Sequence, residues 1–231
     1  MSALAVPAVG QGARAKHHED KRQVLSHPGY ASRWAYLESA TDAYASPSRH
    51  AHVLGYLGTT TQDGTSELLF EQQRVLVNGS WWVQVRLPLR PAGQIGWVPQ
   101  RVLGAPQTVH TYVVVSTETT TLTVYRNGKV IFVTRVGTGK ASTPTPHGQF
   151  YIRDRLTGFP YGSIYGPLAF GTSALSNVET DWPGGGVIGI HGTNEPSLIP
   201  GHPSHGCIRV PNWEIVKLAQ LLPIGTPLTI E

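Results

Sequence analysis

Short apolar runs separated by turn residues constrain this chain more than any other feature of its sequence. Such runs flank Asn78-Gly79 and again flank Asn127-Gly128. Asn-Gly is favoured in two-residue hairpin loops, because both central residues of a type I′ turn have positive φ. The chain also has 26 Gly and 18 Pro among its 231 residues, which disfavours long helices. The sequence therefore predicts a mainly β fold.

One well-patterned helix is expected near the C-terminus. Asn212 is a good N-cap residue and Pro223 would stop the helix. The apolar residues between them fall at i, i+3, i+4 and i+7: Ile215, Leu218, Ala219 and Leu222. This apolar face should pack on the sheet. A shorter helix is expected around residues 32–40, within an N-terminal extension.

The charge pattern limits the choice of partners. The formal net charge is +4, but the basic residues are scattered and form no run of five, so nucleic acid is not expected as a partner. No stretch approaches the roughly 18 uninterrupted apolar residues of a membrane span, so no integral membrane segment is expected. Residues 1–10 lack a basic start and a full apolar region, so no signal peptide is visible.

The chemistry-bearing residues lie in two segments, residues 187–193 (VIGIHGT) and residues 204–210 (SHGCIRV). His191 stands at the end of an expected apolar strand, and the only cysteine of the chain, Cys207, follows Gly206. A thiol attacks an acyl carbon as the thiolate, so a nearby histidine, His191 or His205, is the usual activator. The amides of Gly206 and Cys207 are the candidates for an oxyanion hole, since glycine lets the backbone approach a substrate.

Two other interpretations of these residues are open at this point. A lone cysteine is most often a small buried apolar residue. Alternatively, four side chains have the donor types that bind zinc: His191, His202, His205 and Cys207. Their close spacing matches no structural zinc pattern, so no metal is assigned.

The two segments resemble the signature of the L,D-transpeptidases with a YkuD-type catalytic domain. In that family a histidine followed by Gly-Thr precedes a loop and then Ser/Thr-His-Gly-Cys, an apolar residue, and Arg or Asn. This chain has His191-Gly192-Thr193 and, at residues 204–209, SHGCIR. Residues 137–140 and 143–151 also resemble family segments, and the resemblance covers roughly residues 109–231.

The resemblance implies a role for each matching residue. Cys207 would be the nucleophile and His191 the proton donor and acceptor, with its ring oriented by the backbone carbonyl of Gly192. His205 would help to shape the oxyanion site, or would be a hydrogen-bonded loop histidine. Arg209 and Ser204 are the substrate-binding candidates; Arg209 could equally be a surface residue, and Ser204 suits a local turn hydrogen bond. No cofactor is implied.

The implied reaction joins peptidoglycan stem peptides. Cys207 would form a thioester with the third stem residue, and an amine from a neighbouring stem would then complete a 3→3 crosslink. Reaction with water would instead make the protein an L,D-carboxypeptidase or amide hydrolase, and a non-catalytic wall-binding protein is the alternative from another class. The family also implies acylation of Cys207 by carbapenems. The Gly- and aromatic-rich residues 154–177 are expected to form a lid over the donor stem or to pack under a loop.

Residues 53–103 resemble a second family, the bacterial SH3-like domains. The resemblance lies in Leu57, in the GSWWVQV run at residues 79–85, in Gly96-Trp97-Val98 and in Leu103. The expected organisation is an extension at 1–44, an SH3-like barrel at 45–105 that would bind wall polymer, a linker near residues 104–108, and the catalytic domain at 106–231. The tryptophans would either form the barrel core or line a ligand groove. Both resemblances imply an extracytoplasmic location, in the cell wall or periplasm.

Overall fold

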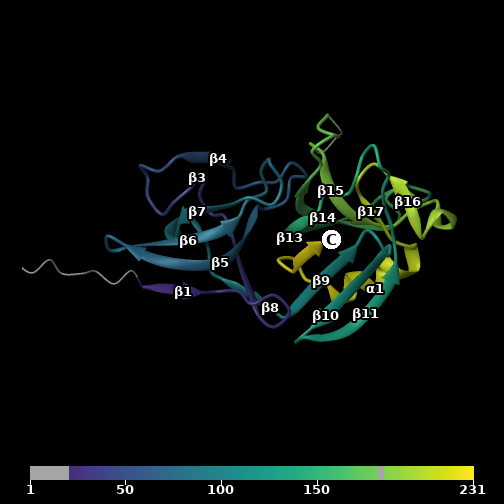
Figure 1. Cartoon of the computed structure of the whole chain (residues 1–231), viewed down its shortest axis with the longest axis horizontal. Helices are drawn as coiled ribbons and strands as arrows, with labels where there is room; N and C mark the ends of the chain where they lie inside the picture. Colours follow the sequence, from purple (N-terminus) through teal and green to yellow (C-terminus); the bar gives the residue numbers. More distant parts are fainter. Residues whose placement is uncertain (1–20, 182–184) are drawn as a thin grey trace, which may run out of the picture.

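The computed structural model describes residues 21–181 and 185–231, which form two β lobes side by side (Figure 1). The N-terminal lobe (residues 21–109) and the C-terminal lobe (residues 111–231) each have their own sheet and apolar core. The mainly β prediction is confirmed. No helix in the described ranges is long and apolar enough to cross a membrane.

The described part of the N-terminal lobe contains one sheet of eight strands, in the order β4-β3-β7-β6-β5-β2-β8, with β1 also paired to β5. Its strands are β1 (Arg22–Val24), β2 (Ser32–Tyr36), β3 (Thr41–Tyr44), β4 (Val53–Leu57), β5 (Leu68–Val77), β6 (Ser80–Arg86), β7 (Ile95–Pro99) and β8 (Gln107–Val109). As expected, Asn78 and Gly79 have positive φ in the turn that joins β5 to β6.

Three features of this lobe differ from the sequence predictions. The segment expected to form a helix around residues 32–40 contains β2, because Trp34 and Ala35 are buried between β5 and β8 and long-range pairing outweighs local propensity. Strands β1 to β3, expected in an extension, belong to the sheet. Gln107 and Thr108, expected in a linker, pair with β2.

The tryptophans of the N-terminal lobe divide between its core and its surface. Trp82 and Trp97 are buried in one apolar cluster with Tyr44. Trp81 is half-buried, and the guanidinium carbon of Arg74 lies 4.4 Å from the centre of its ring. The core interpretation therefore holds for Trp82 and Trp97. The similarity of this lobe to SH3-like domains stays a prediction.

The described part of the C-terminal lobe contains a sheet of ten strands, in the order β11-β10-β9-β18-β13-β14-β15-β17-β12-β16. Its strands are β9 (Thr111–Ser116), β10 (Thr121–Arg126), β11 (Lys129–Arg135), β12 (Gly137–Gly139), β13 (Gly148–Thr157), β14 (Leu168–Leu175), β15 (Val187–His191), β16 (Gly201–Ser204), β17 (Ile208–Arg209) and β18 (Pro227–Ile230). Residues 154–157 and 168–175 of the expected lid belong to β13 and β14, so the loop itself spans residues 158–167.

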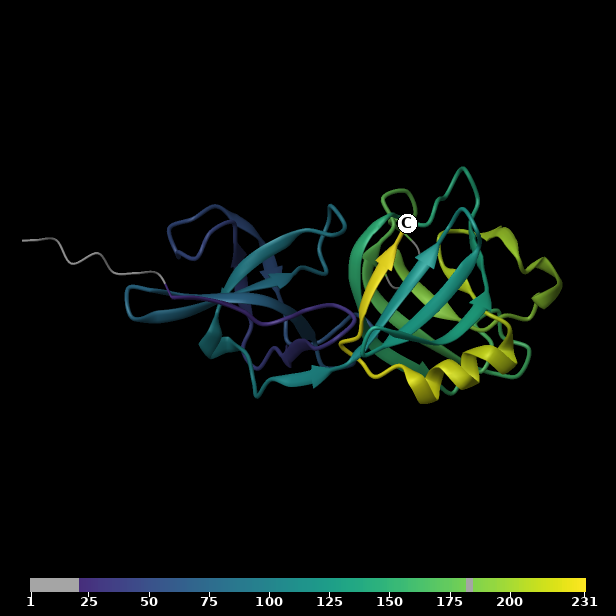
Figure 2. The same cartoon turned by 60° about the horizontal axis from the view of Figure 1, so that its bottom comes forward.

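Helix α1 (Asn212–Leu221) packs on this sheet through Ile215 and Leu218, as predicted, and Figure 2 shows it along the lower side of the lobe. Its N-cap residue is Pro211 rather than Asn212. The Asn212 side chain instead accepts a hydrogen bond from the Thr193 N–H at 2.8 Å. The start of the helix is thereby fastened to the loop that follows β15.

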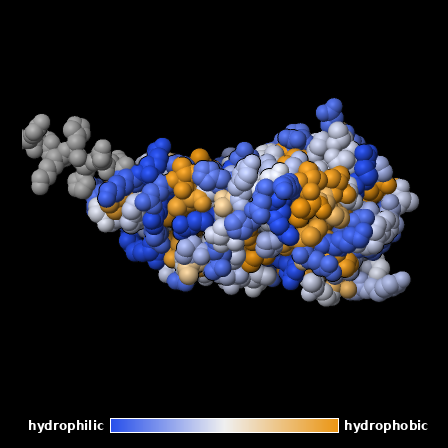
Figure 3. All heavy atoms as spheres, turned by 90° about the horizontal axis from the view of Figure 1, so that it is seen from below, coloured by the Kyte–Doolittle hydropathy of each residue, from blue (hydrophilic) through white to orange (hydrophobic). Residues whose placement is uncertain are grey.

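The edge strand β11 carries exposed apolar side chains, Val130, Ile131 and Val133. Hydrophobic residues gather on the C-terminal lobe when the molecule is seen from below (Figure 3). Lys129 and Arg135 stand at the two ends of β11. Charged residues at an edge strand disfavour pairing with another chain.

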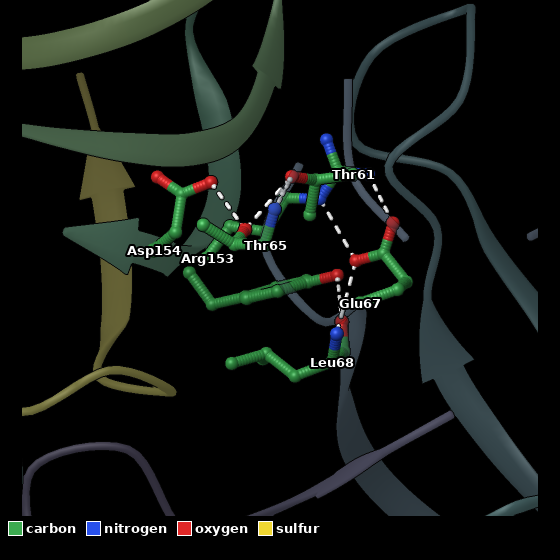
Figure 4. Close-up of polar contacts among 7 residues, drawn as sticks. Thr61, Thr65, Glu67, Leu68, Arg153 and Asp154 are labelled. Atoms are coloured by element: carbon green, nitrogen blue, oxygen red, sulfur yellow. Dashed lines mark hydrogen bonds and ion pairs between the residues drawn. The ribbon is translucent and has the colours of Figure 1, made fainter. Parts of the chain in front are cut away.

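Buried polar contacts join the two lobes (Figure 4). Arg153 of β13 pairs with Glu67, which directly precedes β5, and both side chains are buried. The Tyr151 hydroxyl donates to the Leu68 carbonyl oxygen at 3.0 Å. Because an unpaired buried charge is costly, these contacts favour a single arrangement of the lobes.

Candidate active site

Two parallel strands, β15 and β17, place the reactive side chains. Ile190 pairs with Ile208 and His191 pairs with Arg209, so Gly189 lies next to Cys207. The Gly189 N–H donates to the Cys207 sulfur at 3.4 Å. A side chain at position 189 would contact both groups, since its Cβ would lie 3.7 Å from His191 Cδ2 and 4.0 Å from the sulfur. The register thus gathers the imidazole and the thiol around one glycine.

His191 is buried and its ring is held on two sides. Nδ1 lies 2.6 Å from the carbonyl oxygen of Gly192. A carbonyl oxygen only accepts, so Nδ1 carries the proton and Nε2 is left as the basic nitrogen. The ring of Tyr165 packs edge-on, 5.1 Å away between centroids. Burial lowers the pKa of His191 to about 4, against the raising effect of the Gly192 hydrogen bond, and the charge of Arg209 lowers it further.

Cys207 is half-buried, and its thiol is neutral at rest. Burial raises the pKa of the Cys207 thiol, while the Gly189 hydrogen bond and the charge of Arg209 partly oppose that rise. At neutral pH the site therefore holds a protonated thiol and a neutral imidazole rather than an ion pair. A neutral imidazole can take the thiol proton as the sulfur attacks.

Two pockets meet at these groups, and both are lined by Tyr165, Val187, His191 and Cys207. The first, named here the Arg209 pocket, also includes Glu179, Ser204, His205 and Arg209. The second, the Asp63 pocket, also includes Phe159, Gly171, Gly189 and Asp63 of the N-terminal lobe. Cys207 thus borders both pockets, which does not fit an inert core cysteine.

The loop before Cys207 is shaped by hydroxyl groups. Ser204 is buried; its Oγ donates to the Cys207 carbonyl oxygen at 2.6 Å and accepts the Gly206 N–H at 3.1 Å. Thr145 Oγ1 donates to the Gly206 carbonyl oxygen at 2.8 Å. Gly206 has φ +118°, a conformation that side chains disfavour. Ser204 therefore supports the loop, and the Gly206 amide is already engaged, which leaves the Cys207 N–H as the stronger oxyanion candidate.

Arg209 and His205 line the Arg209 pocket. Arg209 Nη1 lies 2.8 Å from Glu195 Oε2, and its side chain is 15% exposed. His205 is exposed, and its Nε2 lies 2.9 Å from Lys140 Nζ. Arg209 can reach a substrate carboxylate only if it gives up or shares its bond to Glu195.

Three of the four candidate zinc ligands, His191, His205 and Cys207, line the Arg209 pocket, but they do not form a metal site. Within residues 21–181 and 185–231 no group of three or more His, Cys, Asp or Glu side chains could hold a metal ion. His202 instead places its Nδ1 2.8 Å from Thr138 Oγ1.

Sequence reasoning did not single out four residues of this site: Asp63, Tyr165, Gly189 and Asn212. Gly189 interrupts the apolar run between Ile188 and Ile190, which is a local signal for close approach. Tyr165 lies within the Gly- and aromatic-rich residues 154–177, whose pattern does not distinguish it from the other aromatics there. No local signal connects Asp63, on the other lobe, to this pocket.

A thiol and a neutral imidazole that line the same pockets are the groups that thiol-dependent acyl transfer requires. Residues 110–230 match the family model of the YkuD L,D-transpeptidase catalytic domain. The chain belongs to this family of acyltransferases, and the matched residues include both His191 and Cys207.

Relatives carry the same assignment in their names. YkuD of Bacillus subtilis (strain 168), named for L,D-transpeptidase activity, is 36% identical over 141 residues, covering 60% of this chain and 76% of the relative. YqjB of the same organism, also named for that activity, is 36% identical over 127 residues, covering 52% of this chain and 70% of the relative.

Solved structures are also similar to part of this chain. The catalytic domain of the E. faecium L,D-transpeptidase is 29% identical with a TM-score of 0.39, over 52% of this chain and 96% of that chain. The Ldtfm-avibactam carbamoyl enzyme is 29% identical with a TM-score of 0.40, over 53% of this chain and 49% of that chain, so this chain spans about half of its length.

Proposed function

We propose that this L,D-transpeptidase forms 3→3 crosslinks between peptidoglycan stems through a thioester on Cys207. The observation that carries the proposal is the Gly189-centred arrangement, in which the Cys207 sulfur and the His191 ring line the same two pockets. His191 is the base, because its Nδ1 proton is committed to Gly192 and its Nε2 is free to exchange a proton.

Acylation follows from these groups. The sulfur attacks the carbonyl carbon of the third stem residue while His191 Nε2 takes the thiol proton. The carbonyl oxygen becomes negative and is stabilised by the Cys207 N–H. The C–N bond to the terminal D-Ala then breaks, the D-Ala amine takes the proton from His191, and the thioester remains.

Deacylation reverses these proton movements with a new nucleophile. The amine of a second stem attacks the thioester carbon, its proton passes to His191, and the C–S bond breaks as the sulfur is reprotonated. The two pockets let one stem stay bound on the thioester while the other approaches. Water in place of the amine would give carboxypeptidase products instead.

Stems of this kind lie in the cell wall, so an extracytoplasmic location belongs to the proposal. Binding of wall polymer by the N-terminal lobe is part of the same hypothesis.

Intact-mass measurement tests the proposal. The protein is mixed with a tetrapeptide stem, or with a carbapenem, and the mass gain and its position are determined. We expect one adduct on Cys207 and none on Cys207→Ala. Adding an acceptor amine should yield the crosslinked peptide. Absence of an adduct on the unmodified protein, or an adduct on Cys207→Ala, would overturn the proposal.

A further inference from the structure

A hairpin of the N-terminal lobe, residues 60–66, reaches the C-terminal lobe beside the active site. Its ends are closed by the Thr60–Ser66 bridge and by the Thr61 N–H bond to the Thr65 carbonyl oxygen at 2.8 Å. Gly64 has φ +78° at the tip, a conformation that suits glycine in a tight turn. The hairpin therefore has a defined local shape.

Contacts with the C-terminal lobe fix the position of this hairpin. Thr65 Oγ1 donates to Asp154 Oδ2 at 3.1 Å (Figure 4). Asp154 Oδ1 accepts the Gly171 N–H at 3.0 Å. The buried Glu67–Arg153 pair lies immediately after the hairpin. Asp154 thus connects the hairpin to β14, whose Gly171 lines the Asp63 pocket.

Asp63 is exposed near the tip of this hairpin and lines the pocket that contains Cys207 and His191. Among the described residues its carboxylate makes no ion pair. It is the one Asp, Glu, Lys or Arg among the described lining residues of that pocket. The carboxylate also lies close enough to Asp154 to contribute, after burial, to the raised pKa of Asp154.

The charges around the sulfur are therefore unequal on its two sides. The Arg209 pocket is lined by the guanidinium of Arg209 and by the carboxylate of Glu179, so it contains charges of both signs. The Asp63 pocket contains a lone carboxylate between apolar and aromatic walls, which suits an approaching ammonium group.

We propose that Asp63 is a specificity-determining residue that draws a cationic acyl acceptor, a primary ammonium compound, into the Asp63 pocket. This inference rests on the proposed thioester at Cys207. The ammonium group first gives one proton to solvent; the neutral amine then attacks the thioester carbon, the C–S bond breaks, and its second proton passes through His191 to the sulfur. Asp63 favours binding of the acceptor and takes no part in acylation.

The test uses the full chain, a tetrapeptide donor and two nucleophiles that differ in charge. One is a stem peptide whose acceptor amine is protonated at pH 7, and the other is hydroxylamine, which is neutral at pH 7 and also cleaves thioesters. The variants are Asp63→Asn, which removes the charge with little change in shape, and Glu118→Gln, a control that removes an exposed carboxylate outside the pocket.

For Asp63→Asn we expect the KM for the cationic stem acceptor to rise about threefold to fivefold, the factor that an exposed ion pair supplies. The rate of Cys207 acylation and the reaction with hydroxylamine should both stay within twofold of the unmodified protein. Added salt should reduce the difference between the two proteins, because it screens the charge. Glu118→Gln should behave as the unmodified protein.

The outcomes separate this inference from the proposed function. If Cys207 is acylated but Asp63→Asn leaves the KM of the cationic acceptor unchanged, the role of Asp63 is wrong while the thioester mechanism stands. If Asp63→Asn slows acylation instead, the Asp63 pocket takes the donor and the inference is overturned. If the unmodified protein forms no thioester, the proposed function itself fails.

Discussion

The imidazole of His191 donates its Nδ1 proton to the carbonyl oxygen of the next residue, Gly192, over 2.6 Å. A backbone carbonyl thereby orients the imidazole ring, as a carboxylate does in a Ser-His-Asp triad. Because this acceptor carries no full charge, it cannot offset the burial of the ring, and the pKa of His191 stays low.

Replacing His191 should remove the proposed base without unfolding the protein. In His191→Gln, we expect Cys207 acylation by a carbapenem to slow by about 10²- to 10⁴-fold, the usual contribution of a general base. The rate is measured by intact mass over time, and circular dichroism checks the fold. An acylation rate equal to that of the unmodified protein would refute the assignment.

The acylation rate should fall at a lower pH than it would with a histidine of ordinary pKa as the base. The pKa of His191 is lowered to about 4, so its basic form is present above that pH and is lost as the pH falls through it. We therefore expect the acylation rate to change little between pH 5 and 6.5 and to fall near pH 4. An inflection near pH 6.5 in the measured rate profile would contradict a neutral, buried imidazole.

Breaking the ion pair between the lobes should lower the free energy of unfolding markedly. In Glu67→Gln the buried Arg153 guanidinium loses its partner, and we expect the free energy of unfolding to fall by about 3–5 kcal/mol. The matched control is Glu214→Gln, which breaks a pair whose Lys217 side chain is 59% exposed and should cost under about 1 kcal/mol. Denaturant titration of the two variants measures both values, and equal losses would contradict the assigned role of burial.

The bond from Thr193 to Asn212 should position the loop that carries the Gly192 carbonyl. In Asn212→Ala the buried Thr193 N–H loses its acceptor, and we expect a loss of about 1–3 kcal/mol in stability together with slower acylation.

Asn212→Asp keeps an oxygen at this position and should restore most of the acylation rate. Asn194→Ala, on the exposed part of the same loop, is the control. Acylation at the normal rate in Asn212→Ala, measured by intact mass, would show that the loop is positioned without this bond.

Local chemistry made several features predictable from the sequence alone. The Asn-Gly turns require positive φ, so both hairpins were predictable, and the spacing of Ile215 and Leu218 predicted the face that α1 buries. The SHGCIR and HGT segments identified the family, because they bring a nucleophile, a base and a flexible backbone into two short runs.

Tertiary structure decided what depends on contacts between distant residues. Residues 32–36 form a strand because β5 and β8 offer partners on both sides, although their local pattern favoured a helix. The sequence predicts Asn212 as a helix cap, yet its side chain accepts a hydrogen bond from Thr193 of a separate loop. Asp63 reaches the pocket of Cys207 only because Glu67 and Thr65 bind Arg153 and Asp154 across the lobes. Residue types and local periodicity determine turns, helix faces and reactive groups, whereas long-range packing determines which of those groups share a pocket.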